Sequence, residues 1–98
     1  MERYSTRTID DLGRIVLPSD ARKRLELEAG DKLSITIVET IVILHRGSDA
    51  STPECATCQV SDLGMIELPR EVRQKLGWNV KDQVALYLTD NVVIIKLT

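Results

Sequence analysis

Asp11-Leu12-Gly13-Arg14-Ile15-Val16-Leu17-Pro18 is matched, 51 positions later and without a gap, by Asp62-Leu63-Gly64-Met65-Ile66-Glu67-Leu68-Pro69. The match extends over roughly 40 residues per copy, a period typical of repeated structural units. It continues through the pairs Arg22/Arg73, Leu25/Leu76, Asp31/Asp82, Val42/Val93 and Ile43/Ile94. We therefore divide the 98-residue chain into a first copy at residues 1–46, a linker at 47–56 and a second copy at 57–98.

The size of the chain indicates that the two copies depend on each other. A chain of 98 residues has the length of one domain, and half of it would bury too little surface to fold well alone. The linker is rich in Gly, Ser, Thr and Pro, so it leaves the copies free to pair within one chain.

The first half of each copy has the pattern of two strands and a short helix. Residues 4–10 form a β-type run, Gly13 supplies the positive φ of a short hairpin, and residues 14–17 resume as a strand. Pro18 ends that strand because it cannot donate to a ladder. Apolar residues spaced by four then predict an amphipathic helix of about two turns over residues 19–25.

The second half of each copy has the pattern of a β-hairpin. Residues 33–37 and 84–88 alternate with period two, and two-residue turns follow at 39–40 and 90–91. The returning strands, 41–44 and 92–95, are apolar on both faces, which is typical of strands covered on both sides. The sequence therefore predicts a mainly β protein with short helices, built from two ββαββ repeats that close on each other.

Positive charge is concentrated in the first copy. The net charge of −2 argues against a generic nucleic-acid coat. Residues 6–25, however, hold five cations and three acidic residues, whereas the matching residues 57–76 hold three of each. A basic cluster of this kind points to phosphate binding, although a solvated charged surface is the alternative.

The first copy resembles the AbrB/MazE swapped-hairpin (SpoVT-AbrB) DNA-binding domain family. The resemblance rests on the pattern Asp-x-Leu-Gly-Arg-Ile-x-Leu-Pro-x-x-x-Arg-x-x-Leu at residues 10–25, followed by Gly-Asp-x-Leu and a terminal hairpin. It implies a swapped-hairpin β-barrel, formed here as an intramolecular pseudo-dimer. The tandem arrangement is similar to that of the MraZ regulators. It also implies DNA contacts from Arg7, Arg14, Arg22 and Lys23.

The second copy departs from this pattern at three of those positions, where it has Cys58, Met65 and Gln74. We therefore expect the first copy to dominate DNA binding. For Arg22 the sequence leaves a structural role open, an ion pair or hydrogen bond within the copy, because Arg73 repeats it and the aspartate of Asp31/Asp82 is repeated too. The full set of candidate DNA-binding residues is Arg7, Arg14, Arg22, Lys23, Arg24, Arg73 and Lys75.

Cys55 and Cys58 form a Cys-x2-Cys pair, which is half of a tetrahedral zinc site. The chain has no second pair and one histidine, His45, so zinc would need ligands from another chain. Ordinary reduced cysteines are the favoured interpretation, and an intermolecular metal site and a redox pair are the alternatives. We expect no cofactor.

The residues do not predict an enzyme, because no nucleophile, Gly-rich phosphate loop or carboxylate pair stands at a recognisable spacing. We expect a cytoplasmic, bacterial-type transcription regulator that binds double-stranded DNA. No apolar run is long enough for a membrane span, and no small-molecule substrate is expected. Whether chains pair further into a homodimer is left open. The alternatives are an antitoxin-type repressor of a toxin–antitoxin pair and an assembly module that does not bind DNA.

Overall fold

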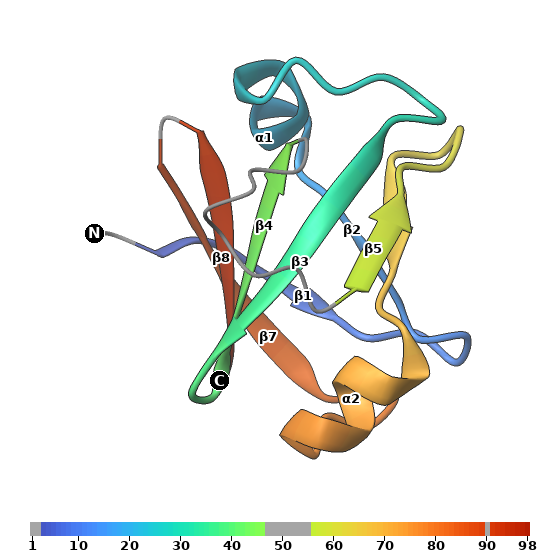
Figure 1. Cartoon of the computed structure of the whole chain (residues 1–98), viewed down its shortest axis with the longest axis vertical. Coiled ribbons are helices and arrows are strands. Elements are labelled where there is room, and N and C mark those ends of the chain that lie inside the picture. The colour runs from blue at the N-terminus through green and yellow to red at the C-terminus, as the bar shows by residue number, and fades with distance from the viewer. Residues whose placement is uncertain (1–2, 47–55, 90) are drawn as a thin grey trace.

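The computed structural model describes residues 3–46, 56–89 and 91–98, with side chains from residue 5 onward (Figure 1). These residues form a mainly β structure with two short helices, as the sequence predicts. Neither helix is long and apolar enough to cross a membrane. The elements are β1 (Arg3–Thr8), β2 (Arg14–Val16), α1 (Ser19–Arg24), β3 (Lys32–Val38), β4 (Ile41–Arg46), β5 (Ala56–Gln59), β6 (Met65–Glu67), α2 (Arg70–Leu76), β7 (Gln83–Leu88) and β8 (Val92–Leu97).

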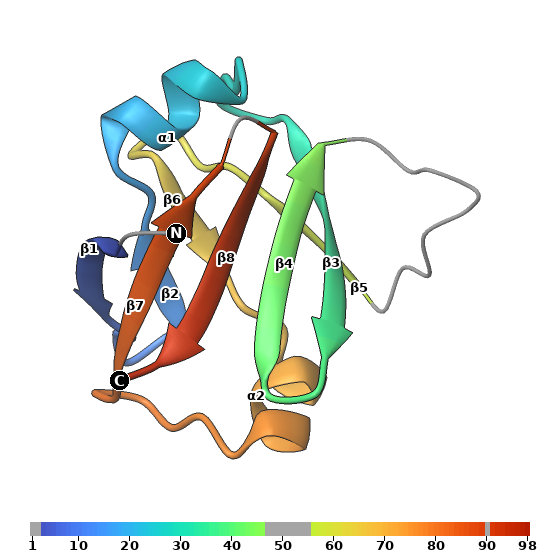
Figure 2. The same cartoon turned by 90° about the vertical axis from the view of Figure 1, so that its left-hand side faces the viewer.

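The two halves of the chain exchange strands. The larger sheet is antiparallel and has the order β1-β7-β8-β4-β3-β5, and a smaller ladder pairs β2 with β6. In Figure 2 the ladder lies behind β7 and β8, and α1 and α2 lie at opposite ends of the molecule. Each half thus supplies an edge strand to the hairpin of the other, which is a swapped-hairpin, barrel-like arrangement. In the described residues the larger sheet ends at β1 and β5 and does not close into a ring.

The strand register shows an internal two-fold symmetry. Ile15 pairs with Ile66 in the small ladder, and Ile43 pairs with Ile94 where β4 meets β8. The members of each pair stand 51 positions apart. The axis therefore passes through both pairs, and residues 51 positions apart occupy matching places on its two sides.

The core consists almost entirely of aliphatic side chains. Both central isoleucines of the small ladder, Ile15 and Ile66, are fully buried, as are Val42 and Leu44 of β4. The predicted apolar stripe of α1 is confirmed, because Leu17, Ala21 and Leu25 are all buried. The main exception to the aliphatic pattern is Trp78, which is buried at the place that Leu27 takes in the first half.

Two local expectations need correction. Strand β1 ends at Thr8 rather than at residue 10, because residue 10 already belongs to the turn. Strand β4 is not covered on both faces: Val42 and Leu44 face the core, whereas Ile41 and Ile43 are only half-buried on the outer face. The predicted turn at 90–91 includes Asp90, which lies outside the described residues.

An arginine side chain from the other half of the chain packs against each hairpin glycine. Gly13 and Gly64 have φ values of 78° and 75°, as a tight turn requires. A Cβ on Gly13 would lie 2.7 Å from Cζ of Arg73, and a Cβ on Gly64 would lie 2.8 Å from Cζ of Arg22. In addition, the Leu17 N–H donates to the Gly64 carbonyl and the Leu68 N–H donates to the Gly13 carbonyl, each at 2.9 Å. These contacts lock each hairpin against the opposite helix.

This packing predicts a stability difference between two glycine substitutions. Gly13→Ala introduces both a strained φ and a clash that displaces Arg73, whereas Gly30→Ala introduces only strain, because nothing lies within 4 Å of the added Cβ. We expect Gly13→Ala to lower the free energy of unfolding by about 1 kcal/mol more than Gly30→Ala. Urea titrations measure both values. Equal losses would show that the arginine contact contributes nothing.

Candidate nucleic-acid interface

Asp10 organises the turn between β1 and β2 and holds Arg14 beside it. Its Oδ1 accepts the backbone N–H groups of Leu12 and Arg14 at 3.0 and 2.7 Å, and its Oδ2 accepts Nε–H of Arg14 at 2.8 Å. The hydrogen bond from the Arg14 backbone, helped by the Arg14 side chain, holds the pKa of Asp10 below its ordinary value. The Arg14 side chain is 37% exposed, so its outer donors face solvent.

The matching turn of the second half keeps the geometry without the charges. Oγ of Ser61 accepts the backbone N–H groups of Leu63 and Met65 at 3.3 and 3.2 Å, in the way that Asp10 accepts those of Leu12 and Arg14. Met65 takes the place of Arg14. The turn therefore does not need the ion pair, which makes Asp10 and Arg14 candidates for a function beyond folding.

Arg7 belongs to β1, and its side chain reaches β2. Its Nε donates to the Val16 carbonyl at 3.2 Å and its Nη1 donates to the Thr6 carbonyl at 3.1 Å, and the side chain is half-buried. Cys58, at the matching place, is 8% exposed, and burial raises the pKa of its thiol to about 11. That thiol is therefore protonated and unreactive at neutral pH.

The other half of the predicted Cys-x2-Cys pair, Cys55, lies outside the described residues. The described ranges contain no group of three or more His, Cys, Asp or Glu side chains that could hold a metal ion. The imidazole of His45 contacts Thr36 instead, with its Nε2 3.1 Å from Oγ1 of that residue.

Arg22 and Arg73 each make a structural hydrogen bond within their own copy, which is one of the two forms that the sequence left open. Nε of Arg22 donates to the Leu17 carbonyl at 3.3 Å, and Nε of Arg73 donates to the Leu68 carbonyl at 3.1 Å. The repeated aspartates are not the acceptors. Asp31 and Asp82 cap local turns, each accepting a backbone N–H at 2.8 Å. The guanidinium is needed to satisfy a carbonyl at the start of each helix, a partner that sequence spacing does not reveal.

The remaining predicted cations lie on the helices. Lys23 and Arg24 are exposed in the last turn of α1, where positive charge also suits the helix dipole. At the matching places of α2, Gln74 is uncharged and Lys75 is an exposed cation. Of these positions, only that of Lys23 differs in charge between the two halves.

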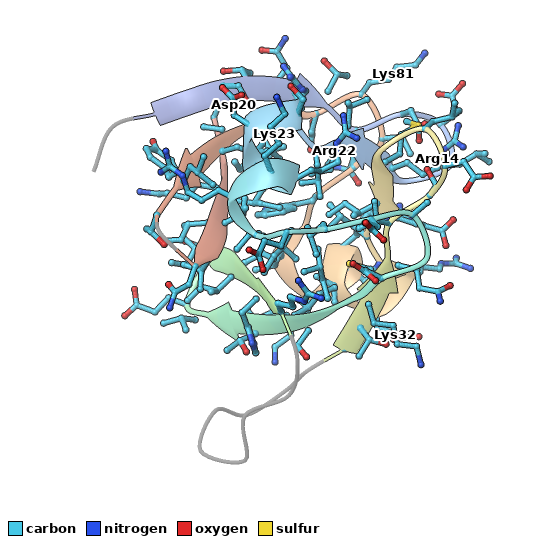
Figure 3. The ribbon with its side chains drawn as sticks, turned by 90° about the horizontal axis from the view of Figure 1, so that it is seen from above. Arg14, Asp20, Arg22, Lys23, Lys32 and Lys81 are labelled. Atoms are coloured by element: carbon cyan, nitrogen blue, oxygen red, sulfur yellow. The ribbon has the colours of Figure 1, made fainter. Side chains whose placement is uncertain are left out.

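Lys81 is a candidate that the sequence did not single out. Its backbone N–H donates to the Ile9 carbonyl at 2.6 Å, so this second-half lysine lies beside the first-half turn. Its φ is +74°, a conformation that its counterpart Gly30 adopts without strain. Figure 3 shows Lys23, Arg22, Arg14 and Lys81 along one side of the molecule and Lys32 on the opposite side. The replacement of Gly30 by a lysine in the second copy is the signal that could have found it.

We call the set Arg7, Arg14, Lys23 and Lys81 the basic face. Their counterparts across the two-fold axis are Cys58, Met65, Gln74 and Gly30, none of which carries a charge at neutral pH. The fold is thus nearly symmetric, but only one of its two matching sides carries the basic face. Guanidinium and ammonium groups gathered in this way suit phosphate oxygens.

The chain is similar to known proteins in part of its sequence and in its fold. Residues 6–50 match the family model of MazE, described as antidote-toxin recognition and bacterial antitoxin. The solution structure of PHS018 from Pyrococcus horikoshii shares 21% identity, with a TM-score of 0.55, over 100% of this chain and 92% of that one. That likeness shows a common fold along the whole chain. No curated protein matches the sequence.

The Asp10–Arg14 pair predicts a pH dependence of stability. Because the folded state lowers the pKa of Asp10, its stabilising contribution is present above about pH 4 and is lost as the pH falls through the folded-state value. Asp10→Ser copies Ser61, keeps the turn acceptor and removes the charge. We expect a stability gap between the chain and this variant at pH 7 that narrows toward pH 3, measured by urea unfolding. A stability gap that stays constant from pH 7 to pH 3 would show that the charge of Asp10 does not stabilise the fold.

Proposed function

We propose that the protein is a DNA-binding transcriptional regulator that contacts duplex DNA through the basic face. The observation that carries this proposal is the place of Arg14, Lys23 and Lys81 on one side of a nearly symmetric fold, together with Arg7, whose side chain reaches from β1 to β2. Folding does not require them, because the matching side of the same fold lacks all four. The match of residues 6–50 to MazE adds support, since that segment contains Arg7, Arg14 and Lys23.

Three cations of the basic face have distinct places in this proposal. Asp10 holds the Arg14 guanidinium at the turn, so a phosphate or base edge meets a donor that is already ordered. Lys23 and Lys81, both exposed, supply flexible charges for the DNA backbone on the same side of the molecule as Arg14. Arg22 and Arg73 pack against the hairpin glycines. Arg24 and Lys75 add one positive charge at the matching place of each half.

We further propose that the two halves are tandem copies of one swapped-hairpin domain, in an arrangement similar to that of the MraZ regulators. The 51-residue offset of the ladder pairs supports this interpretation. In this proposal the protein works in the cytoplasm, where its DNA lies, and catalyses no reaction.

An antitoxin is the second candidate function. The specific support is the description of the matched family as antidote-toxin recognition. An antitoxin would bind DNA as well, so DNA binding alone does not separate the two candidates. Co-purification of a stoichiometric protein partner encoded beside the gene would favour the antitoxin, and its absence would favour the regulator.

The proposed asymmetry predicts unequal effects of matched substitutions. Arg14→Ala should weaken DNA binding by about 1–3 kcal/mol, because it removes a charge-assisted contact, whereas Met65→Ala should change it little. Fluorescence anisotropy with one labelled duplex measures both affinities, and thermal unfolding checks that both variants are folded. Equal losses, or a loss only from Met65→Ala, would contradict the basic face.

The salt dependence of binding gives an independent prediction. Each phosphate contact contributes about −0.9 to the slope of log affinity against log salt, so the four cations should give about −4. Lys81→Ala should make the slope shallower by about 1, and Lys32→Ala, on the opposite side, should leave it unchanged. A flat salt response would show that the cations are only a solvated surface and would favour an assembly module.

A further inference from the structure

A groove of about 520 Å³ lies beside β5 and is lined mainly by residues of the second half; we call it the β5 groove. Its lining comes from β5 and the two residues after it, from the end of β6, from the proline before α2 and from the first residue of β3. It contains hydrogen-bonding and charged side chains, including Thr57, Gln59, Glu67 and Lys32.

The first half shows what fits such a groove. The positions 51 residues before Thr57, Cys58 and Glu67 are Thr6, Arg7 and Val16. There the Arg7 side chain crosses from β1 to β2, and its guanidinium donates to the Val16 and Thr6 carbonyls at 3.2 and 3.1 Å. The same place in the second half has the short side chain of Cys58, so the space of the guanidinium is left open.

The acceptors of that guanidinium are repeated as well. β5 pairs with β3 in the register in which β1 pairs with β7, with Thr57 opposite Ser34 as Thr6 is opposite Ala85. The carbonyl of Thr57 therefore points away from the sheet, as that of Thr6 does, and the carbonyl of Glu67 corresponds to that of Val16. Among the described residues no side chain donates to either carbonyl in the way that Arg7 does.

We propose that the β5 groove binds the arginine side chain of a partner polypeptide, in the place that Arg7 fills in the first half. Two backbone carbonyls fixed by β5 and β6 match the planar, multidentate donors of a guanidinium better than the single charge of an ammonium. Glu67 adds a carboxylate where the first half has Val16. Lys32, which replaces Gln83, adds an opposing charge and reduces the affinity.

This site is separate from the basic face. The β5 groove belongs to the second half, and the basic face gathers around the β1–β2 turn of the first, so both can be occupied at once. The inference therefore does not depend on DNA binding. A chain that fails to bind DNA could still bind the arginine, and the two proposals fail separately.

The experiment is an NMR titration of the full chain with a blocked Gly-Arg-Gly peptide, compared with the same peptide carrying citrulline or lysine. Citrulline has nearly the shape of arginine without its charge. We expect saturable shifts of the amides at 57–61, 67 and 68, and binding about tenfold weaker for the other two peptides. Absence of saturable shifts at these amides, or equal binding of the citrulline peptide, would overturn the proposal.

The internal symmetry provides matched variants. Cys58→Arg should fill the groove and abolish the peptide shifts, and Arg7→Cys should open a second groove with shifts at residues 6–10 and 16–18. Lys32→Gln, a surface change that installs the residue found at the matching position 83, should tighten binding and does not depend on repacking. Shifts that persist in a folded Cys58→Arg chain, or binding weakened by Lys32→Gln, would contradict the site.

Discussion

The packing of each hairpin glycine under the helix arginine of the opposite half is the contact on which this structure depends. A Cβ on Gly13 would displace the end of the Arg73 side chain, and a Cβ on Gly64 would displace that of Arg22. Each arginine also satisfies a carbonyl at the start of its own helix. A single side chain thus connects its own helix to the partner hairpin, and the contact is made twice. The strand exchange also joins the two halves, because each half supplies an edge strand to the hairpin of the other.

A duplicated structural contact leaves the two faces free to differ. The turns around Asp10 and Ser61 have the same backbone hydrogen bonds, yet one holds an arginine and the other presents a methionine. The two faces also differ at the matching positions of Arg7 and Cys58. The first has the arginine side chain, and the second has the β5 groove. In our proposals one face binds DNA and the other an arginine of a partner, so a nearly symmetric fold carries two different surfaces.

The two halves also differ in which residues occupy the matching positions of positive backbone φ. Glu26 has a φ of 56° where Gly77 has 71°, and Lys81 has 74° where Gly30 has 91°. A side chain in this region costs on the order of 1 kcal/mol relative to glycine. The strain at Lys81 coincides with a cation beside the first-half turn, which agrees with its place in the basic face. At Glu26, Arg46 donates to the carbonyls of Leu25 and Glu26 and so supports the end of α1.

The sequence by itself determined the repeat, the hairpins, the short helices and the clustering of cations in the first half, because these depend on local turn chemistry and on the period of apolar residues. Only the tertiary structure decided the partners of Arg22, the position of Lys81 and the existence of the β5 groove. The acceptor of Arg22 is a backbone carbonyl, which leaves no trace in residue identity. Lys81 and the groove arise where segments from different halves meet, and pairing across a two-fold axis brings together residues that spacing along the chain keeps apart.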